Sequence, residues 1–209
     1  MVWLASYPRS GNTFLRIILW QCFGLRSASI YSNDLGGNKK LAEYVGHIEH
    51  DTDEKIRFSK NSIPLVKTHE YPSDKSPAIY VIRDGRAACV SLWEFYNKSL
   101  PLEVCVEGQH HFGAWSSHVQ SWDPWDRPDT LLLKYEDMTN DLPVILNRIS
   151  TFLGCEIISE SVPDRNAIAK ADGRWVKAKT NWRSELYGDL LKRFNQLNKD
   201  VLVKAGYLD

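Results

Sequence analysis

The chain has 209 residues, of which 43% are hydrophobic and 25% are charged. This composition is typical of a globular domain with a sizeable core, and it excludes a disordered or fibrous chain. The 26 basic residues equal the 26 acidic residues in number. Overall charge therefore favours neither nucleic acid nor a membrane surface as a partner, and any anion site must come from a few locally placed cations.

Short apolar runs alternate with helical patterns from the N-terminus onward. Residues 2–6 form an apolar run suited to a buried strand, and residues 12–23 are apolar nearly all round, as in a buried helix that Gly24 ends. Further strands are expected at residues 65–69, 78–83 and 130–135. Further helices are expected at residues 39–45, 86–96, 111–122, 141–153, 163–170 and 184–204.

This alternation predicts an α/β fold of three layers, in which helices flank a central parallel sheet. The rest of residues 27–61 is expected to be loop, and no linker or repeat divides the chain. We therefore expect a single domain over residues 1–209. In such sheets, ligands bind beyond the carboxyl ends of the strands.

The four cysteines are widely spaced and form no CxxC pair; they are Cys22, Cys89, Cys105 and Cys155. We expect buried free thiols in a reducing compartment rather than disulfides or metal ligands. The apolar start is too short for a signal peptide, and no apolar run reaches the length of a membrane span. These features lead us to expect a cytoplasmic protein.

The first motif is the loop at residues 7–14, YPRSGNTF, between the first strand and the first helix. Such a loop offers main-chain N–H groups and the positive end of the helix dipole to an anion. Arg9 adds a positive charge and Thr13 a hydroxyl. The Walker pattern GxxxxGKS/T is absent because Asn12, rather than lysine, follows Gly11. Taken alone, the loop has an ordinary strand-to-helix turn as its alternative.

The second motif, VKTHEYP at residues 66–72, places Lys67 and His69 two positions apart at the end of a strand. Residues i and i+2 of a strand point to the same side, so both side chains could face one site. Histidine is the usual general base near neutral pH. A histidine on its own is more often structural than catalytic.

The third motif begins at Arg83, where the strongest strand ends, and includes Ser91 eight residues later. That spacing places Ser91 about two turns into the following helix. A guanidinium fork and a hydroxyl suit the binding of a second phosphate. Taken singly, a surface salt bridge and a helix-packing serine are the favoured alternatives.

Together these motifs resemble the cytosolic-type sulfotransferase family, which uses 3′-phosphoadenosine-5′-phosphosulfate (PAPS). The family's YPKSGTTW loop corresponds to YPRSGNTF, its KTHxP motif to residues 67–72, and its YEDM segment to residues 135–138. Its arginine and the serine eight residues later correspond to Arg83 and Ser91. The resemblance implies a P-loop-NTPase-like sulfotransferase fold. It also implies transfer of a sulfuryl group from PAPS to an acceptor hydroxyl or amine by in-line displacement, with PAP as the product nucleotide and no metal.

The resemblance further implies a role for each matched position. His69 would be the general base, and Lys67 and Arg9 would be electrostatic partners of the transferring group. The loop would hold the 5′-phosphosulfate, partly through the Asn12 and Thr13 side chains. Phe14, in place of the family's tryptophan, and Tyr135 would approach the adenine. The expected donor-binding residues are Arg9, Ser10, Gly11, Asn12, Thr13, Phe14, Arg83, Ser91, Tyr135, Lys177 and Lys179.

The C-terminal part departs from the family, which has an Arg-Lys-Gly segment closing over the 3′-phosphate. Here Arg174, Lys177 or Lys179 could supply that cation, and Trp182 could be the corresponding tryptophan. The spacing does not decide between these cations.

Two other functions stay open. A P-loop-like kinase would normally carry the Walker lysine, which is absent. A non-catalytic nucleotide-binding protein would not need the lysine, histidine, arginine and serine of the second and third motifs. The acceptor, whether a small molecule, a glycan or a peptide, has no readable code. We expect no nucleic-acid or membrane partner, and the sequence leaves a homodimer open.

Remaining residues have weaker signals. His110 and His111 are expected to be a helix-start or surface pair rather than metal ligands. Three tryptophans could line an acceptor pocket or pack in the core; they are Trp115, Trp122 and Trp125.

Overall fold

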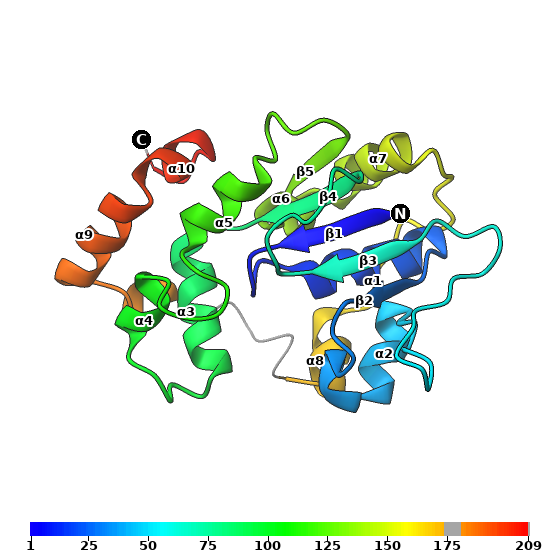
Figure 1. Cartoon of the computed structure of the whole chain (residues 1–209), viewed down its shortest axis with the longest axis horizontal. Helices are drawn as coiled ribbons and strands as arrows, with labels where there is room; N and C mark the ends of the chain where they lie inside the picture. The colour runs from blue at the N-terminus through cyan, green and yellow to red at the C-terminus, as the bar shows by residue number, and fades with distance from the viewer. Residues whose placement is uncertain (174–180, 209) are drawn as a thin grey trace.

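A computed structural model describes residues 1–173 and 181–208 of the chain. Its strands form one sheet in the order β2-β3-β1-β4-β5, with each adjacent pair parallel (Figure 1). Because β1 lies between β3 and β4, the strands that follow β1 in the chain lie first on one side of it and then on the other. Such a reversal of strand order is a topological switch point, where α/β sheets bind ligands. The strands are β1 (Val2–Ser6), β2 (Ser27–Ser29), β3 (Leu65–Thr68), β4 (Ala78–Ile82) and β5 (Thr130–Lys134).

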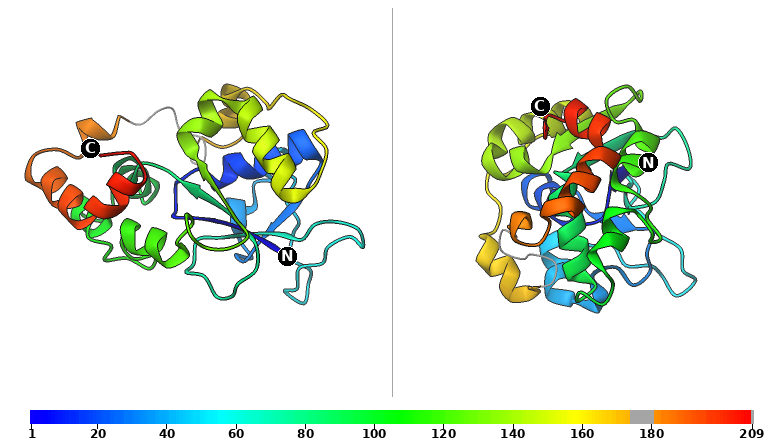
Figure 2. Two further views of the ribbon diagram at one scale, coloured as in Figure 1. Left: turned by 90° about the horizontal axis from the view of Figure 1, so that it is seen from above. Right: turned by 90° about the vertical axis from the view of Figure 1, so that its left-hand side faces the viewer.

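Helices cover the sheet on both faces. Figure 1 shows α3, α4, α5, α9 and α10 grouped on one side, with α1, α2, α7 and α8 toward the other, and Figure 2 shows the same grouping from above and from the side. The described helices are α1 (Asn12–Phe23), α2 (Lys39–Val45), α3 (Gly85–Phe95), α4 (Leu102–Val106), α5 (Trp115–Trp122), α6 (Tyr135–Asn140), α7 (Leu142–Leu153), α8 (Arg165–Ala171), α9 (Gly188–Leu197) and α10 (Lys199–Lys204), with 3-10 helices η1 (Asp34–Gly37) and η2 (Trp182–Ser184).

Two large hydrophobic cores lie on opposite faces of the sheet. Ala5 and Tyr80 enter the core that α3, α5 and α10 cover, whereas Leu4 and Ile79 enter the core that α1 and α7 cover. Successive residues of a strand point to opposite faces. The near-continuous apolar sequence of β1 and β4 is thus explained by burial on both faces.

The register brings the carboxyl ends of three strands to one edge. Ala5 is level with Thr68 of β3 and with Tyr80 of β4. The chain therefore leaves the sheet at nearly the same height after Ser6, after Thr68 and shortly after Ile82. All three motifs predicted from the sequence follow these strand ends.

The expected α/β fold with a central parallel sheet flanked by helices is confirmed. The four cysteines are free thiols, of which three are buried and Cys155 is partly buried. Trp115 and Trp122 are buried in the core, so their alternative as acceptor-pocket residues is wrong, and Trp125 packs against the same core. In the part of the chain that the structure describes, no helix combines the length and the apolar character that crossing a membrane requires.

The predicted helix at residues 111–122 begins later than expected, at Trp115. Gly113 has a φ of +69°, in the left-handed region, and an added Cβ there would lie 2.5 Å from the Tyr71 hydroxyl oxygen. The chain at Gly113 therefore turns under Tyr71 rather than continuing a helix.

The predicted helix at residues 184–204 is wrong as one element, because it divides into α9 and α10 at Asn198. The Asn198 side chain donates to the carbonyl of Phe194 and accepts from the main-chain N–H of Ser116. A buried asparagine that bonds main-chain groups competes with continuous helical hydrogen bonding. The sequence also missed β2, α4 and α6, which are too short for a periodic signal.

Candidate active site

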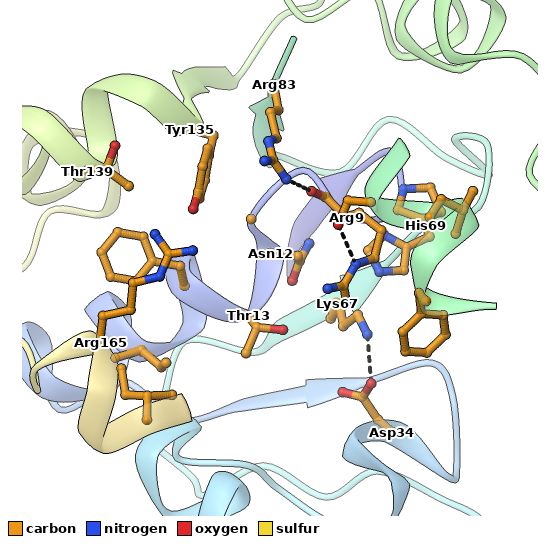
Figure 3. A pocket seen from close by; sticks show the side chains of 18 of the residues that line it. Arg9, Asn12, Thr13, Asp34, Lys67, His69, Arg83, Tyr135, Thr139 and Arg165 are labelled. Carbon is orange, nitrogen blue, oxygen red and sulfur yellow. Dashed lines mark hydrogen bonds and ion pairs between the residues drawn. The ribbon is translucent and has the colours of Figure 1, made fainter. Parts of the chain in front are cut away.

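A cavity of about 640 Å³ opens beyond the carboxyl ends of β1, β3 and β4 (Figure 3). Ser10 is fully buried and does not line it. Lys177 and Lys179, like Arg174, lie outside the described residues. The cavity brings together these residues predicted from the sequence: Arg9, Gly11, Asn12, Thr13, Phe14, Lys67, His69, Arg83, Ser91 and Tyr135.

The loop between β1 and α1 has the backbone of an anion cradle. Arg9 and Gly11 have φ angles of +66° and +106°, and Gly11 is the N-cap of α1. Glycine has no side chain to bond the first N–H groups of the helix, which therefore remain as donors at the cavity. An added Cβ on Gly11 would lie 2.4 Å from Cδ2 of Tyr135, so the close approach of the Tyr135 ring requires glycine here.

Asn12 anchors this loop to the sheet. Its amide nitrogen donates to the carbonyl of Leu4 at 2.8 Å and lies 3.4 Å from the hydroxyl oxygen of Ser6. The side-chain amide therefore holds the loop in place. The contact with the sulfuryl donor that the sequence predicts for Asn12 would then come from its main-chain N–H. Thr13, by contrast, lines the cavity, and Figure 3 shows its side chain there.

Two arginines from different elements meet at the cavity wall. Arg9 donates from Nε to the hydroxyl oxygen of Ser91 at 3.2 Å, and its guanidinium lies 5.0 Å from the centroid of the Phe95 ring. Arg83 lies over the Tyr135 ring, 4.8 Å from its centroid. Burial and then the Arg83 charge lower the pKa of Arg9 to about 10. Two cations that repel each other in a half-enclosed cavity favour the entry of an anion.

Lys67 forms a buried ion pair with Asp34. Its Nζ lies 2.7 Å from Oδ1 of Asp34, and the two side chains are 4% and 2% exposed. The same Nζ lies 5.3 Å from the centroid of the Tyr31 ring. Burial lowers the pKa of Lys67 from its ordinary value, whereas the Asp34 carboxylate raises it.

The hydrogen bonds of His69 fix its tautomer. Its Nδ1 lies 2.8 Å from the main-chain carbonyl of Ser6, which can only accept, so Nδ1 carries the proton. In the neutral ring, Nε2 is then the unprotonated nitrogen. Burial, and next the charge of Lys67, hold the pKa of His69 well below its ordinary value. The ring therefore has the protonation state of a base at neutral pH.

His118 holds His69 through its main chain. Nε2 of His118 donates to the carbonyl of His69 at 3.0 Å, and Nδ1 accepts from the Tyr80 hydroxyl at 2.9 Å. Burial lowers the pKa of His118 to about 4. A neutral histidine therefore links β4 to the strand end that carries the candidate base.

His110 and His111 have separate hydrogen-bonding partners. His110 exchanges a hydrogen bond with the Tyr7 hydroxyl, and His111 is exposed beside Glu70. Across residues 1–173 and 181–208, no group of three or more histidine, cysteine, aspartate or glutamate residues could hold a metal ion.

Sequence reasoning missed other residues of the cavity wall. They come from segments without periodic pattern or from helices predicted only for their apolar faces. Arg165 reaches from α8 toward Tyr135 and Thr139 (Figure 3). The only local signal was the turn sequence around Asp34, which precedes two glycines. The missed residues include Tyr31, Asp34, Phe95, Phe112, Thr139 and Arg165.

With this geometry established, comparisons with known proteins identify the family. The sulfotransferase domain family matches residues 1–172. The chain belongs to this family. Sulfotransferase 4A1 of Homo sapiens is 27% identical over 173 residues, which cover 73% of this chain and 59% of that relative. This sulfotransferase-family chain thus spans less than two thirds of the length of that relative.

Solved structures with the same fold extend the likeness to most of the chain. Retinol dehydratase in a complex with retinol and PAP has a TM-score of 0.63 and 21% identity, covering 96% of this chain and 80% of that one. Mouse sulfotransferase SULT7A1, complexed with PAP, has a TM-score of 0.61 and 20% identity, covering 96% of this chain and 84% of that one. At this identity the likeness establishes the sulfotransferase fold alone.

Proposed function

We propose that this chain transfers a sulfuryl group from PAPS to an acceptor hydroxyl or amine. One observation carries the proposal: a neutral histidine, a buried lysine and two arginines face a single cavity at the switch point of the sheet. His69 is the base of this set. Lys67 and Arg9 flank it, Arg9 donates to the Ser91 hydroxyl, and Arg83 donates to the main-chain carbonyl of Arg9.

The donor half of the cavity suits a nucleotide with two separate anions. The N–H groups at the start of α1, with Arg9, form the subsite for the 5′-phosphosulfate. Arg83 and Ser91 form the subsite for the 3′-phosphate, and Phe14 and Tyr135 supply aromatic surface for the base. The two solved relatives named above are complexes with PAP, which is the product nucleotide of this reaction.

The transfer follows from the orientation of His69. Its Nε2 accepts the proton of the acceptor group while the acceptor oxygen or nitrogen attacks sulfur. The bond from sulfur to the bridging oxygen of PAPS breaks on the opposite side, and PAP leaves with that electron pair. Lys67 and Arg9 stabilise the charge that develops on the sulfuryl oxygens and on the bridging oxygen. The proposal assigns this stabilisation to side-chain cations and gives no step to a metal.

Aromatic side chains border the cavity near the base and favour a small, flat acceptor. The Tyr31 ring stacks on His69 with centroids 6.1 Å apart, and Phe112 meets the same ring edge-on at 6.0 Å. Phe95 and Tyr96 extend this wall. An acceptor with an apolar body and one hydroxyl would bury its body here and present its hydroxyl to His69.

A kinase of the same fold and a non-catalytic nucleotide-binding protein are the competing functions. Asn12 occupies the position where a Walker loop carries lysine, and its amide is bound to Leu4. The tautomer of His69 would have no evident use in a protein that only binds a nucleotide.

Thermal unfolding with PAP and with adenosine 5′-phosphate, which lacks the 3′-phosphate, tests the donor half. PAP at a hundredfold excess over its Kd should stabilise the protein by about 2.7 kcal/mol, and adenosine 5′-phosphate at the same concentration should do so far less. Formation of PAP from PAPS in the presence of 2-naphthol tests the transfer. Equal stabilisation by both nucleotides, or phosphorylation that depends on Mg·ATP with no binding of PAPS, would contradict the proposal.

A further inference from the structure

Asp34 bridges two buried cations at the floor of the cavity. Its Oδ1 accepts from Nζ of Lys67 at 2.7 Å, and its Oδ2 accepts from Nη1 of Arg16 at 2.5 Å. All three side chains are at most 4% exposed. Figure 3 shows Lys67 reaching down to Asp34 from β3, the strand that ends just before His69. Two cations and one anion leave one net positive charge at this place.

Arg16 is fixed independently of Lys67. Its Nε donates to the Ser27 hydroxyl at 2.8 Å, and its Nη2 lies 2.7 Å from Nδ1 of His47. Arg16 therefore has bonds to β2 and to the segment after α2, besides its bond to Asp34. A guanidinium with a rigid planar fork, held on several sides, gives the carboxylate a fixed partner.

The turn that carries Asp34 is equally fixed. Leu35 and Gly36, which follow Asp34 in η1, have φ angles of +61° and +57°. A leucine in the left-handed region is uncommon and costs free energy that the surroundings must offset. Leu35 is 1% exposed and packs with Ile17 and Leu41 in a small core. The packing of one side chain therefore sets the position of the neighbouring carboxylate.

We propose that Asp34 is a positioning residue for sulfuryl transfer, one that holds the ammonium of Lys67 charged and aimed at the transferring group. The proposal rests on the function proposed above, because it assigns Asp34 a part in the same reaction. Asp34 acts through Lys67 and touches no reacting atom.

The charges around Lys67 explain why it needs an anion. The groups that face it are Asp34 of η1, Arg16 of α1, Arg9 of the first loop, the ring of Tyr31, and His69, whose pKa is lowered by burial and then by the Lys67 charge. Burial and the two arginines lower the pKa of Lys67, and Asp34 raises it. Without the carboxylate, a buried ammonium would face two guanidinium groups, and the least costly response would be loss of its proton.

The alternative hypothesis is that Asp34 only neutralises Arg16 and so stabilises the fold. The two hypotheses predict different effects of Asp34→Asn on the rate when Lys67 has already been replaced. If Asp34 acts through Lys67, the Asp34→Asn change should alter the rate in the wild type and have little further effect in a Lys67→Met background. If Asp34 serves only Arg16, the two changes should have independent effects on the rate.

The first experiment is a double-mutant cycle on PAP formation from PAPS with 2-naphthol. Lys67→Met should lower kcat by roughly 100- to 1,000-fold, as expected for loss of one electrostatic partner of the transition state. Asp34→Asn should lower it by at least about tenfold at pH 8.5 and by less at pH 6.5, where a larger fraction of Lys67 is protonated. The double variant should lie within about twofold of Lys67→Met.

Ser27→Ala is the matched control, because it removes a partner of Arg16 without touching Lys67. It should leave the pH dependence of kcat unchanged. Additive losses in the double variant, or a loss in Asp34→Asn that does not change with pH, would overturn the proposal.

The second experiment does not depend on any reaction. Nitrogen-15 NMR of the lysine side chains, with the Lys67 resonance assigned by its absence in Lys67→Met, follows the titration of Nζ directly. In Asp34→Asn, the midpoint should move to lower pH by about one to three units, the effect expected for loss of an adjacent opposite charge. An unmoved midpoint would overturn the proposal even if the wild type transfers sulfuryl groups. A moved midpoint in a protein with no transferase activity would contradict the proposed function instead.

Discussion

Arg83 donates a hydrogen bond from Nη1 to the main-chain carbonyl of Arg9 at 2.9 Å, across 74 positions of the chain. The bond ties the end of β4 to the loop that follows β1. It holds two guanidinium groups close together although their charges repel. Burial and then this repulsion lower the pKa of Arg9 to about 10. The two proposed anion subsites are thus joined before any nucleotide binds, and this preorganisation reduces the cost of ordering them in the complex.

The Arg83→Ala variant should lose its preference for the 3′-phosphate. A hydrogen bond to a charged group contributes about 1.5–3 kcal/mol, so the ratio of the Kd for adenosine 5′-phosphate to the Kd for PAP should fall roughly 10- to 100-fold. Calorimetric titration with both nucleotides measures this ratio. The ratio is informative because any loosening of the Arg9 loop would weaken both nucleotides together.

Arg148→Ala is the control for that variant. Arg148 lies on α7, bonds the carbonyl of Leu132 and does not line the cavity. It should leave the ratio of the two Kd values unchanged. A ratio in Arg83→Ala equal to that of the wild type would place the 3′-phosphate elsewhere.

The sequence was sufficient to predict every strand of the sheet except β2, and the groups that follow three of these strands. Apolar runs bounded by turn residues mark buried parallel strands, and parallel strands bring their carboxyl ends to one edge. Lys67, His69 and Arg83 could therefore be expected near one another without knowledge of the strand order. Their proximity follows from topology rather than from any contact visible in the sequence.

Asp34 could not be predicted in the same way. It lies in a polar segment with no periodic pattern, and its partners Arg16 and Lys67 are 18 and 33 positions away. Arg16 itself falls within a helix that the sequence marks only as apolar all round. A buried ion pair of this kind depends on the packing of η1 against α1 and α2, which hydrophobic pattern does not encode. The break at Asn198 was missed for a related reason, because its partner Ser116 lies on another helix.

Gly11→Ala should damage both stability and nucleotide binding. The substitution places a Cβ 2.4 Å from Tyr135 at a φ of +106°, and a strained backbone position of this kind costs about 1–3 kcal/mol before any clash. For a chain of this size, each kcal/mol lowers Tm by roughly 2–4 °C. Differential scanning calorimetry with and without PAP measures both effects.

Gly154→Ala is the control for Gly11→Ala, because it introduces backbone strain at a positive φ without a side-chain clash. Gly154 ends α7 at a φ of +64° with nothing within 4 Å of an added Cβ. It should lower Tm by less than Gly11→Ala and leave PAP affinity unchanged. If Gly11→Ala bound PAP as tightly as the wild type, the close approach of Tyr135 to the loop would have no part in nucleotide binding.

His118 should make the protein less stable in mild acid. Burial lowers its pKa to about 4 in the folded state, against about 6.5 when unfolded. The unfolded chain therefore binds a proton first as pH falls, so the contribution is fully present above about pH 6.5 and is lost as pH falls toward the folded value. From pH 6.5 to pH 5 this histidine should account for about 1.6 kcal/mol of lost stability.

His118→Gln should show a flatter pH dependence of its unfolding free energy than the wild type, although its stability at neutral pH will be lower. Its side-chain amide can still donate toward the carbonyl of His69. Urea unfolding at the two pH values measures the difference. Parallel curves for the two proteins would mean that His118 does not take up a proton on unfolding in this range.

The decrease of kcat at low pH, which is the acid limb of the rate profile, should depend on the pKa of His69 and on the charge of its neighbour Lys67. Burial and the Lys67 charge lower the pKa of His69, and a base acts only when unprotonated. The kcat of the wild type should therefore stay level to a pH below the ordinary histidine range and fall only in stronger acid. Lys67→Met removes the charge that contributes to this lowering, so its acid limb should move to higher pH while its maximal rate is smaller.

His69→Gln supplies the test of the base itself, with a loss of kcat of roughly 100- to 10,000-fold and an unchanged Kd for PAP. His111→Ala is the matched control, because that ring is exposed beside Glu70 and does not line the cavity. It should change neither kcat nor the pH at which kcat falls in acid. An acid limb that stays in place in Lys67→Met would show that the lysine does not tune the histidine, whereas a near-normal kcat in His69→Gln would remove the histidine from proton transfer. Because burial acts on His69 in both proteins, the limb of Lys67→Met should still lie below the ordinary histidine range.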